Sequence, residues 1–111
     1  MLSGPAGAEL NSVLRSVWDQ VSANKDAWPF HEPVPPSVVD YLEVVKEPMD
    51  LSLIKTRIDA GDYYTSIDML RRDLELMIAN CTTYNAPDTP YYKAALALSA
   101  CFRPLLGNPG P

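Results

Sequence analysis

The chain has 111 residues, of which 47% are hydrophobic, and a formal net charge of −5. Its length suits one domain with a real core, and its composition excludes a disordered tail. The apolar runs are short, so they predict a soluble protein without a membrane span. The excess of acidic residues either serves solubility alone or favours a basic partner, and it argues against nucleic acid as the primary partner.

The first expected element is a helix over residues 8–24. Apolar side chains recur there at the spacing of an amphipathic helix: Leu10, Val13, Leu14, Val17, Trp18 and Val21. Residues 1–7 are small and turn-prone, so they are set aside as a linker or a cloning remnant, and no signal segment is expected in them. The domain is assigned to residues 8–106, and residues 107–111 are assigned to a tail.

A long stretch over residues 28–48 follows and holds five of the eleven prolines. Proline interrupts both helices and ladders, so this stretch cannot form one regular element. It is also too apolar for a solvated linker. We therefore expect a packed loop, with room for a helical turn or two over residues 37–45.

Three more helices are expected after the loop. The second begins at the capping residue Asp50 and ends at Gly61, and the third begins at Ser66 and ends before Pro87. The fourth begins at Thr89 and runs to about residue 105, and a proline should fray or kink its last turn. Apolar residues lie on most of its sides, so we expect it to be the most enclosed of the four helices. The fold class is therefore all-α, an antiparallel four-helix bundle with a long packed loop between the first two helices.

Residues suited to catalysis are few and scattered. His31 is the one histidine, and Cys81 and Cys101 fall inside helical patterns far from it. A nucleophile needs an adjacent base and a metal site needs clustered ligands, so we expect no enzyme, no metal and no cofactor. Both cysteines are expected to be reduced packing residues of an intracellular protein. The acidic residues are expected mostly on helix exteriors.

Binding is better supported, at the corner formed by residues 80–92. Tyr84 and Asn85 end the third helix there, and a short loop bracketed by prolines follows. Each residue has a plainer explanation: Asn85 as a helix C-cap, Tyr84 as a core aromatic, and Trp28, Pro29 and Phe30 as a core plug. Their combination favours binding, because the two loops open at the same end of an antiparallel bundle and leave a cleft between helices.

The order of these pieces resembles a bromodomain. The matching residues are Trp28, Pro29, Phe30, Pro33, Val34, Tyr41, Pro48, Met49, Asp50, Leu51, Tyr64, Ser66, Asp73, Asn80, Cys81, Thr82, Thr83, Tyr84 and Asn85. The resemblance covers residues 10–105, and the tyrosines after the corner make it most similar to bromodomains of histone-acetyltransferase co-activators. It departs at Leu42, where many members carry a second aromatic residue, and the stretch before Tyr41 is shorter than in many members.

The resemblance implies a left-handed four-helix bundle that binds acetyl-lysine. In that reading the Asn85 amide donates to the acetyl carbonyl, and Tyr41 holds a bridging water. The remaining implied roles are a shelf of Trp28, Pro29 and Phe30, an acyl-chain contact by Val34 and Val39, a wall of Tyr84 and Cys81, and a gatekeeper at Tyr91. The implied partners are acetylated protein tails, histone tails in particular, and the implied location is the nucleus.

The sequence leaves two hypotheses about the function open. The first is a chromatin reader module that binds acetylated lysine, monomeric and part of a larger protein or complex. The alternative is a helical protein–protein interaction module with the same fold but no dependence on acetyl-lysine.

Overall fold

The computed structural model describes residues 5–107 and is all-α over that range. Its elements are α1 (Pro5–Ser22), the 3₁₀ helix η1 (Lys25–Phe30), α2 (Tyr41–Val44), α3 (Leu51–Ala60), α4 (Ile67–Tyr84) and α5 (Pro90–Leu105). The predicted left-handed antiparallel four-helix bundle is confirmed, with α1, α3, α4 and α5 as its members. The first helix begins and ends a few residues earlier than expected, so residues 5–7 are helical, while residues 1–4 and 108–111 of the predicted linker and tail lie outside the described range.

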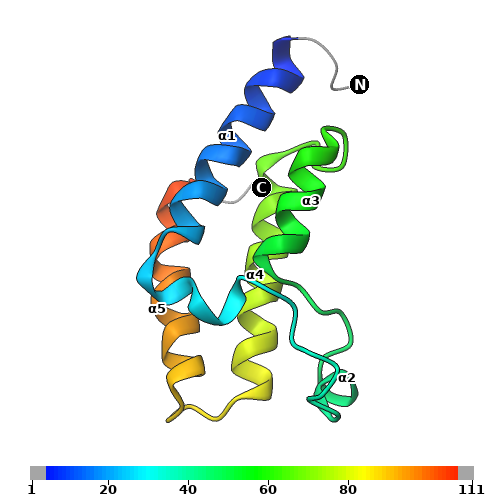
Figure 1. Ribbon diagram of the computed structural model, residues 1–111. Helices are drawn as coiled ribbons and strands as arrows, with labels where there is room; N and C mark the ends of the chain where they lie inside the picture. Colours follow the sequence, from blue (N-terminus) through cyan, green and yellow to red (C-terminus); the bar gives the residue numbers. More distant parts are fainter. Residues whose placement is uncertain (1–4, 108–111) are drawn as a thin grey trace.

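Successive helices of the bundle run in opposite directions, as Figure 1 shows. The long loop leaves η1, crosses to the far side of the bundle, forms the short helix α2 and returns to the start of α3. α4 and α5 lie side by side and are joined by a short connection at the end of the molecule nearest α2. The long loop and the α4–α5 connection therefore meet at one end of the bundle, as the sequence predicts.

The predicted caps explain where the helices start and stop. The side chains of Asp50, Ser66 and Thr89 accept hydrogen bonds from the backbone N–H groups two or three residues on, at 2.9, 3.3 and 3.2 Å. α3 ends at Gly61, whose φ of 84° lies in the left-handed region that favours glycine. α5 includes Pro104 in its last turn and ends at Leu105, close to the predicted end.

The core is a single cluster of apolar side chains from all four bundle helices and η1. α1 docks on α3 partly through Trp18, whose indole Nε1 donates to the carbonyl of Leu51 at 2.8 Å. α5 is less enclosed than predicted: it packs through Ala94, Ala95, Leu98 and Phe102, whereas Leu96 is 52% exposed. Ala97 and Ala100, which lie on the same side of the helix as Leu96, are exposed too, so this side of α5 faces solvent.

A buried carboxylate, Asp73, joins α4 to its neighbours. It is 1% exposed and is therefore an exception to the expectation that the acidic residues lie mostly on helix exteriors. Its Oδ2 accepts from the Tyr64 hydroxyl and from Arg57 Nη1, each at 2.6 Å, and its Oδ1 accepts from Arg72 Nη1 at 2.8 Å. Burial, together with this carboxylate, raises the pKa of Tyr64 far above its ordinary value, so the phenol stays a donor.

The same cluster fastens the end of the long loop to α4. Arg72 Nη2 also donates to both carboxylate oxygens of Glu47, at 3.1 and 3.2 Å. Asn80 Nδ2 donates to the backbone carbonyl of Glu47 at 2.8 Å. These contacts fix the backbone immediately before Pro48, Met49 and Asp50.

No helix within the described residues is long and apolar enough to cross a membrane.

Candidate binding site

A cavity of about 720 Å³ opens where the long loop faces the C-terminal end of α4 and the start of α5. Its lining is mostly apolar and includes five prolines. A hollow of this size and character suits an organic ligand. The lining residues are Pro29, Phe30, Glu32, Pro33, Val34, Pro35, Pro36, Val38, Val39, Tyr41, Leu42, Pro48, Met49, Asp50, Met77, Cys81, Tyr84, Asn85 and Tyr91.

Asn85 supplies an amide to the wall of this cavity. It is the C-cap of α4, but its φ of −103° and ψ of 143° are extended rather than left-handed. Its Nδ2 donates to the carbonyl of Cys81 at 3.0 Å, and the backbone N–H of Asn85 donates to the same oxygen, also at 3.0 Å. The C-cap explanation is therefore correct but incomplete, because the amide nitrogen has two hydrogens: the Cys81 carbonyl engages one, and the other contact of Nδ2 is with Cys81 Sγ, a weak acceptor, at 3.5 Å.

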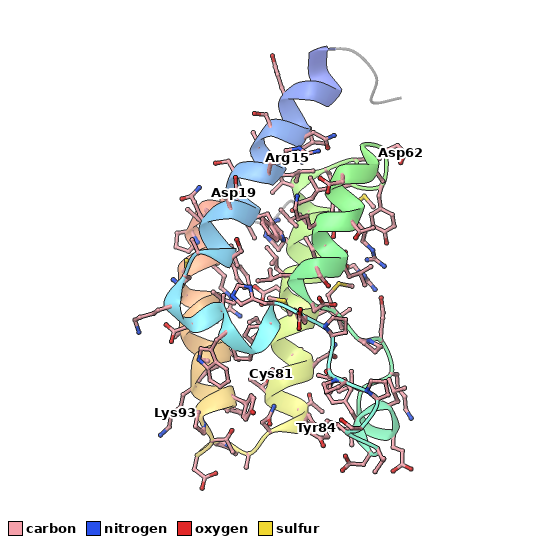
Figure 2. All side chains as sticks on the ribbon, in the orientation of Figure 1. Arg15, Asp19, Asp62, Cys81, Tyr84 and Lys93 are labelled. Carbon is pink, nitrogen blue, oxygen red and sulfur yellow. The ribbon has the colours of Figure 1, made fainter. Side chains whose placement is uncertain are left out.

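Two tyrosines stand beside this amide and join α4 to the loop. The rings of Tyr41 and Tyr84 meet edge to face with centroids 5.0 Å apart, and the Tyr84 hydroxyl donates to Asp40 Oδ1 at 2.6 Å. Figure 2 shows Tyr84 at the end of α4 beside α2. Burial raises the pKa of Tyr41, and the hydrogen bond to Asp40 raises the pKa of Tyr84, so both hydroxyls stay protonated at neutral pH.

Cys81 lies one turn before Asn85, and its thiol is a wall group rather than a nucleophile. It is buried, and burial raises the pKa of its thiol. Its Sγ lies 3.4 Å from the carbonyl oxygen of Tyr91, which ties the end of α4 to the first turn of α5. Cys81 and Cys101 are both free thiols.

The loop side of the cavity is less buried than the helix side. Phe30 is buried and Pro29 is half-buried, whereas Val34 and Val39 are exposed, Val39 to 86%. Trp28 does not line the cavity; it lies outside, with its ring centroid 5.0 Å from that of Tyr91. The core-plug explanation of this segment therefore holds for Phe30 and not for Trp28.

Nine of the ten residues expected at the site thus line one cavity, and Trp28 is the exception. The structure adds Met77 and Met49, which were not expected there, and it places Leu42, the position at which the sequence departs from many bromodomains, in the loop side of the lining. Met77 could have been found from its spacing, since it lies four residues before Cys81 on the same helix face. Met49 gave no such signal, because it precedes a helix and only the course of the loop brings it to the cavity.

Metal chemistry has no support at this site. Within the described residues no group of three or more His, Cys, Asp or Glu side chains could hold a metal ion. His31 is exposed on the loop and does not line the cavity.

The described residues thus form an all-α bundle with a mostly apolar cavity and the side-chain amide of Asn85 at its wall. A family model described as "Bromodomain" matches residues 14–97. The chain belongs to the bromodomain family, a class of acetyl-lysine reader modules associated with chromatin.

Relatives support this membership and set its limits. The chain is 39% identical over 95 residues to the histone acetyltransferase GCN5 of Oryza sativa, covering 85% of this chain and 19% of that protein. It is 41% identical over 80 residues to GCN5 of Debaryomyces hansenii, covering 71% and 17%. It is 37% identical over 90 residues to the nucleosome-remodeling factor subunit NURF301 of Drosophila melanogaster, covering 80% and 3%. The chain therefore spans less than a fifth of each of these relatives, and bromodomains are binding modules rather than catalytic ones.

The hydrogen bond between Tyr84 and Asp40 gives a prediction about the loop. Tyr84→Phe removes the hydroxyl but keeps the ring against Tyr41, so the loop loses the hydrogen bond that Asp40 accepts from α4 and keeps the aromatic contact. We expect amide exchange over residues 38–44 to become about two- to tenfold faster, with a smaller increase in Asp40→Asn, which keeps an acceptor. Hydrogen exchange read by mass spectrometry checks this, and unchanged exchange in Tyr84→Phe would show that the bond does not hold the loop.

Proposed function

We propose that this domain binds acetylated lysine side chains in basic protein tails, histone tails in particular, as a reader module within a larger nuclear protein. The observation that carries the proposal is the Asn85 amide, held at the wall of a mostly apolar cavity that Tyr41 and Tyr84 also line.

The chemistry of lysine explains why such a cavity would prefer the modified side chain. An ammonium group is costly to remove from water without a counter-charge. Acetylation removes the charge and leaves a neutral amide with one strong acceptor. An apolar slot with one amide donor can satisfy that acceptor and bury the methylenes of the stem.

The positions of the lining residues suggest a role for each. Asn85 would donate its second amide hydrogen to the acetyl carbonyl, and Tyr41 would hold a water that bridges to the same oxygen. Tyr84 and Cys81 would form the α4 wall, Pro29 and Phe30 the opposite shelf, Val34 and Val39 the loop side, and Tyr91 the mouth, with Trp28 supporting Tyr91 from outside.

The expected affinity is modest. One neutral hydrogen bond contributes about 1 kcal/mol net, and each buried methylene adds roughly 0.8 kcal/mol. Ordering a flexible tail opposes binding, so we expect a Kd between about 1 μM and 1 mM. The net charge of −5 would help to attract a basic tail. Relatives named as histone acetyltransferases and as a nucleosome-remodeling subunit support a chromatin ligand and a nuclear location.

Calorimetric titration with paired basic peptides tests the proposal. One peptide of each pair carries acetyl-lysine and the other carries unmodified lysine at the same position. We expect heat from the acetylated peptide only. Equal binding of both peptides, or of neither across a broad panel, would favour the alternative, an interaction module that uses another face. Mass spectrometry of the recovered peptide should find the acetyl group intact, and its removal would instead indicate an enzyme.

A further inference from the structure

Trp28 and Tyr91 form an exposed aromatic pair that the proposed acetyl-lysine cavity does not use in full. Trp28 is 49% exposed and Tyr91 is 47% exposed, although their rings lie against each other at a centroid distance of 5.0 Å. Tyr91 lines the cavity and Trp28 does not, so the pair extends from the mouth of the cavity outward over η1 and α5. We call these two rings the aromatic ledge.

The backbone under the ledge is firmly held on both sides. Trp28 lies between Ala27 and Phe30, which are both buried, in a 3₁₀ helix capped by Asn24 through a 2.8 Å hydrogen bond. Tyr91 lies in the first turn of α5, after the capping residue Thr89. Two rings held in place on rigid elements need little ordering when a ligand binds, so their exposed faces form a ready contact surface.

Charge favours a cation as the occupant of the ledge. The faces of Trp and Tyr rings carry negative potential and attract ammonium and guanidinium groups, tryptophan most strongly. The lining of the neighbouring cavity includes the exposed Glu32 and the buried cap Asp50 and no lysine or arginine, whereas η1 and α5 themselves carry the exposed Lys25, which pairs with Asp26, and Lys93. A tail residue one to three positions from the acetyl-lysine can reach the ledge, because an extended chain spans about 3.3–3.6 Å per residue.

We propose that the aromatic ledge binds the side chain of an unmodified lysine or arginine that flanks the acetyl-lysine in the same tail. This inference rests on the proposed function and names a second determinant of its ligand. The acetylated residue would enter the cavity as a neutral group while its neighbour lies on the ledge as a cation. The domain would therefore prefer an acetyl-lysine that has an unmodified lysine or arginine close to it in the same tail.

The test is a peptide scan combined with one variant. Each position within three residues of the acetyl-lysine carries in turn lysine or its uncharged analogue norleucine, and Kd is measured by calorimetry against the wild type and Trp28→Leu. At one or two positions we expect lysine to bind about two- to fivefold more tightly than norleucine in the wild type. In Trp28→Leu that preference should vanish, while the acetyl dependence remains. Tyr63→Leu, which removes an exposed tyrosine that does not line the cavity, is the matched control and should keep the lysine preference.

Four other outcomes would each contradict either the proposed role of the aromatic ledge or the proposed function of the domain. Acetyl-dependent binding with no lysine preference at any position would overturn the ledge and leave the proposed function standing. A preference for norleucine that Trp28→Leu abolishes would make the ledge an apolar contact rather than a cation site. A lysine preference that survives in Trp28→Leu would assign the cation to another part of the surface. A loss of acetyl dependence in the wild type would overturn the proposed function and this inference together.

Discussion

Asn85→Ala should weaken the binding of an acetylated peptide by about 5- to 150-fold in Kd while the domain stays folded. Removing the donor leaves the acetyl carbonyl unpaired in an apolar cavity, which costs about 1–3 kcal/mol, or about 5- to 150-fold in Kd. The free energy of unfolding should change by less than about 1 kcal/mol, because the backbone N–H of Asn85 still donates to the Cys81 carbonyl at 3.0 Å. Calorimetric titration and thermal unfolding measure the two effects separately.

Two further variants sharpen this result. Asn85→Asp keeps the shape and an acceptor oxygen but removes both amide hydrogens, so it should lose affinity as Asn85→Ala does. Thr83→Ala changes an exposed residue in the same turn of α4 that does not line the cavity, and it should keep the wild-type Kd. Unchanged affinity in Asn85→Ala would remove Asn85 from the proposed role, and a weakened Thr83→Ala would mean that the turn, rather than the amide, is responsible.

Asp73→Ala should be among the most destabilising single changes in this domain. It would leave Arg57 without its ion-pair partner and the Tyr64 hydroxyl, which is buried, without an acceptor. Breaking a buried pair by removing one member costs about 3–5 kcal/mol, a large part of the 5–15 kcal/mol that holds an ordinary domain together. Urea denaturation followed by tryptophan fluorescence should show the loss as a lower midpoint with a similar slope.

The controls for Asp73 lie on the same helix and in the same cluster. Glu75→Ala breaks an exposed ion pair with Arg103, at 2.8 and 2.9 Å, and should cost no more than about 1 kcal/mol. Asp73→Asn keeps the volume and one acceptor, so its loss should lie between the two. An Asp73→Ala protein about as stable as Glu75→Ala would show that water takes the place of the carboxylate.

Asn85 and Asp73 illustrate what local sequence can and cannot reveal. The proline after residue 85 and the apolar stripe before it mark the end of a helix, so the position of Asn85 in the chain is predictable. Asp73 lies on the same helix among charged neighbours, and its sequence neighbourhood resembles a solvated face. Only the arrival of Arg57 and Tyr64 from other segments makes its burial favourable, and no local pattern contains that information.

The sequence by itself determined the four bundle helices to within a few residues, because capping side chains, glycine, proline and apolar spacing act over short stretches of chain, but it did not predict the 3₁₀ helix η1. It also determined that two loops open at one end of the bundle, since helix order and antiparallel packing require it. The family resemblance named nine of the residues that line the cavity, but only the tertiary structure brought Met49 and Met77 to it and left Trp28 outside beside Tyr91. The physical reason is that the path of a proline-rich loop without regular hydrogen bonds depends on distant anchors, here Asp40 on Tyr84 and Glu47 on Arg72.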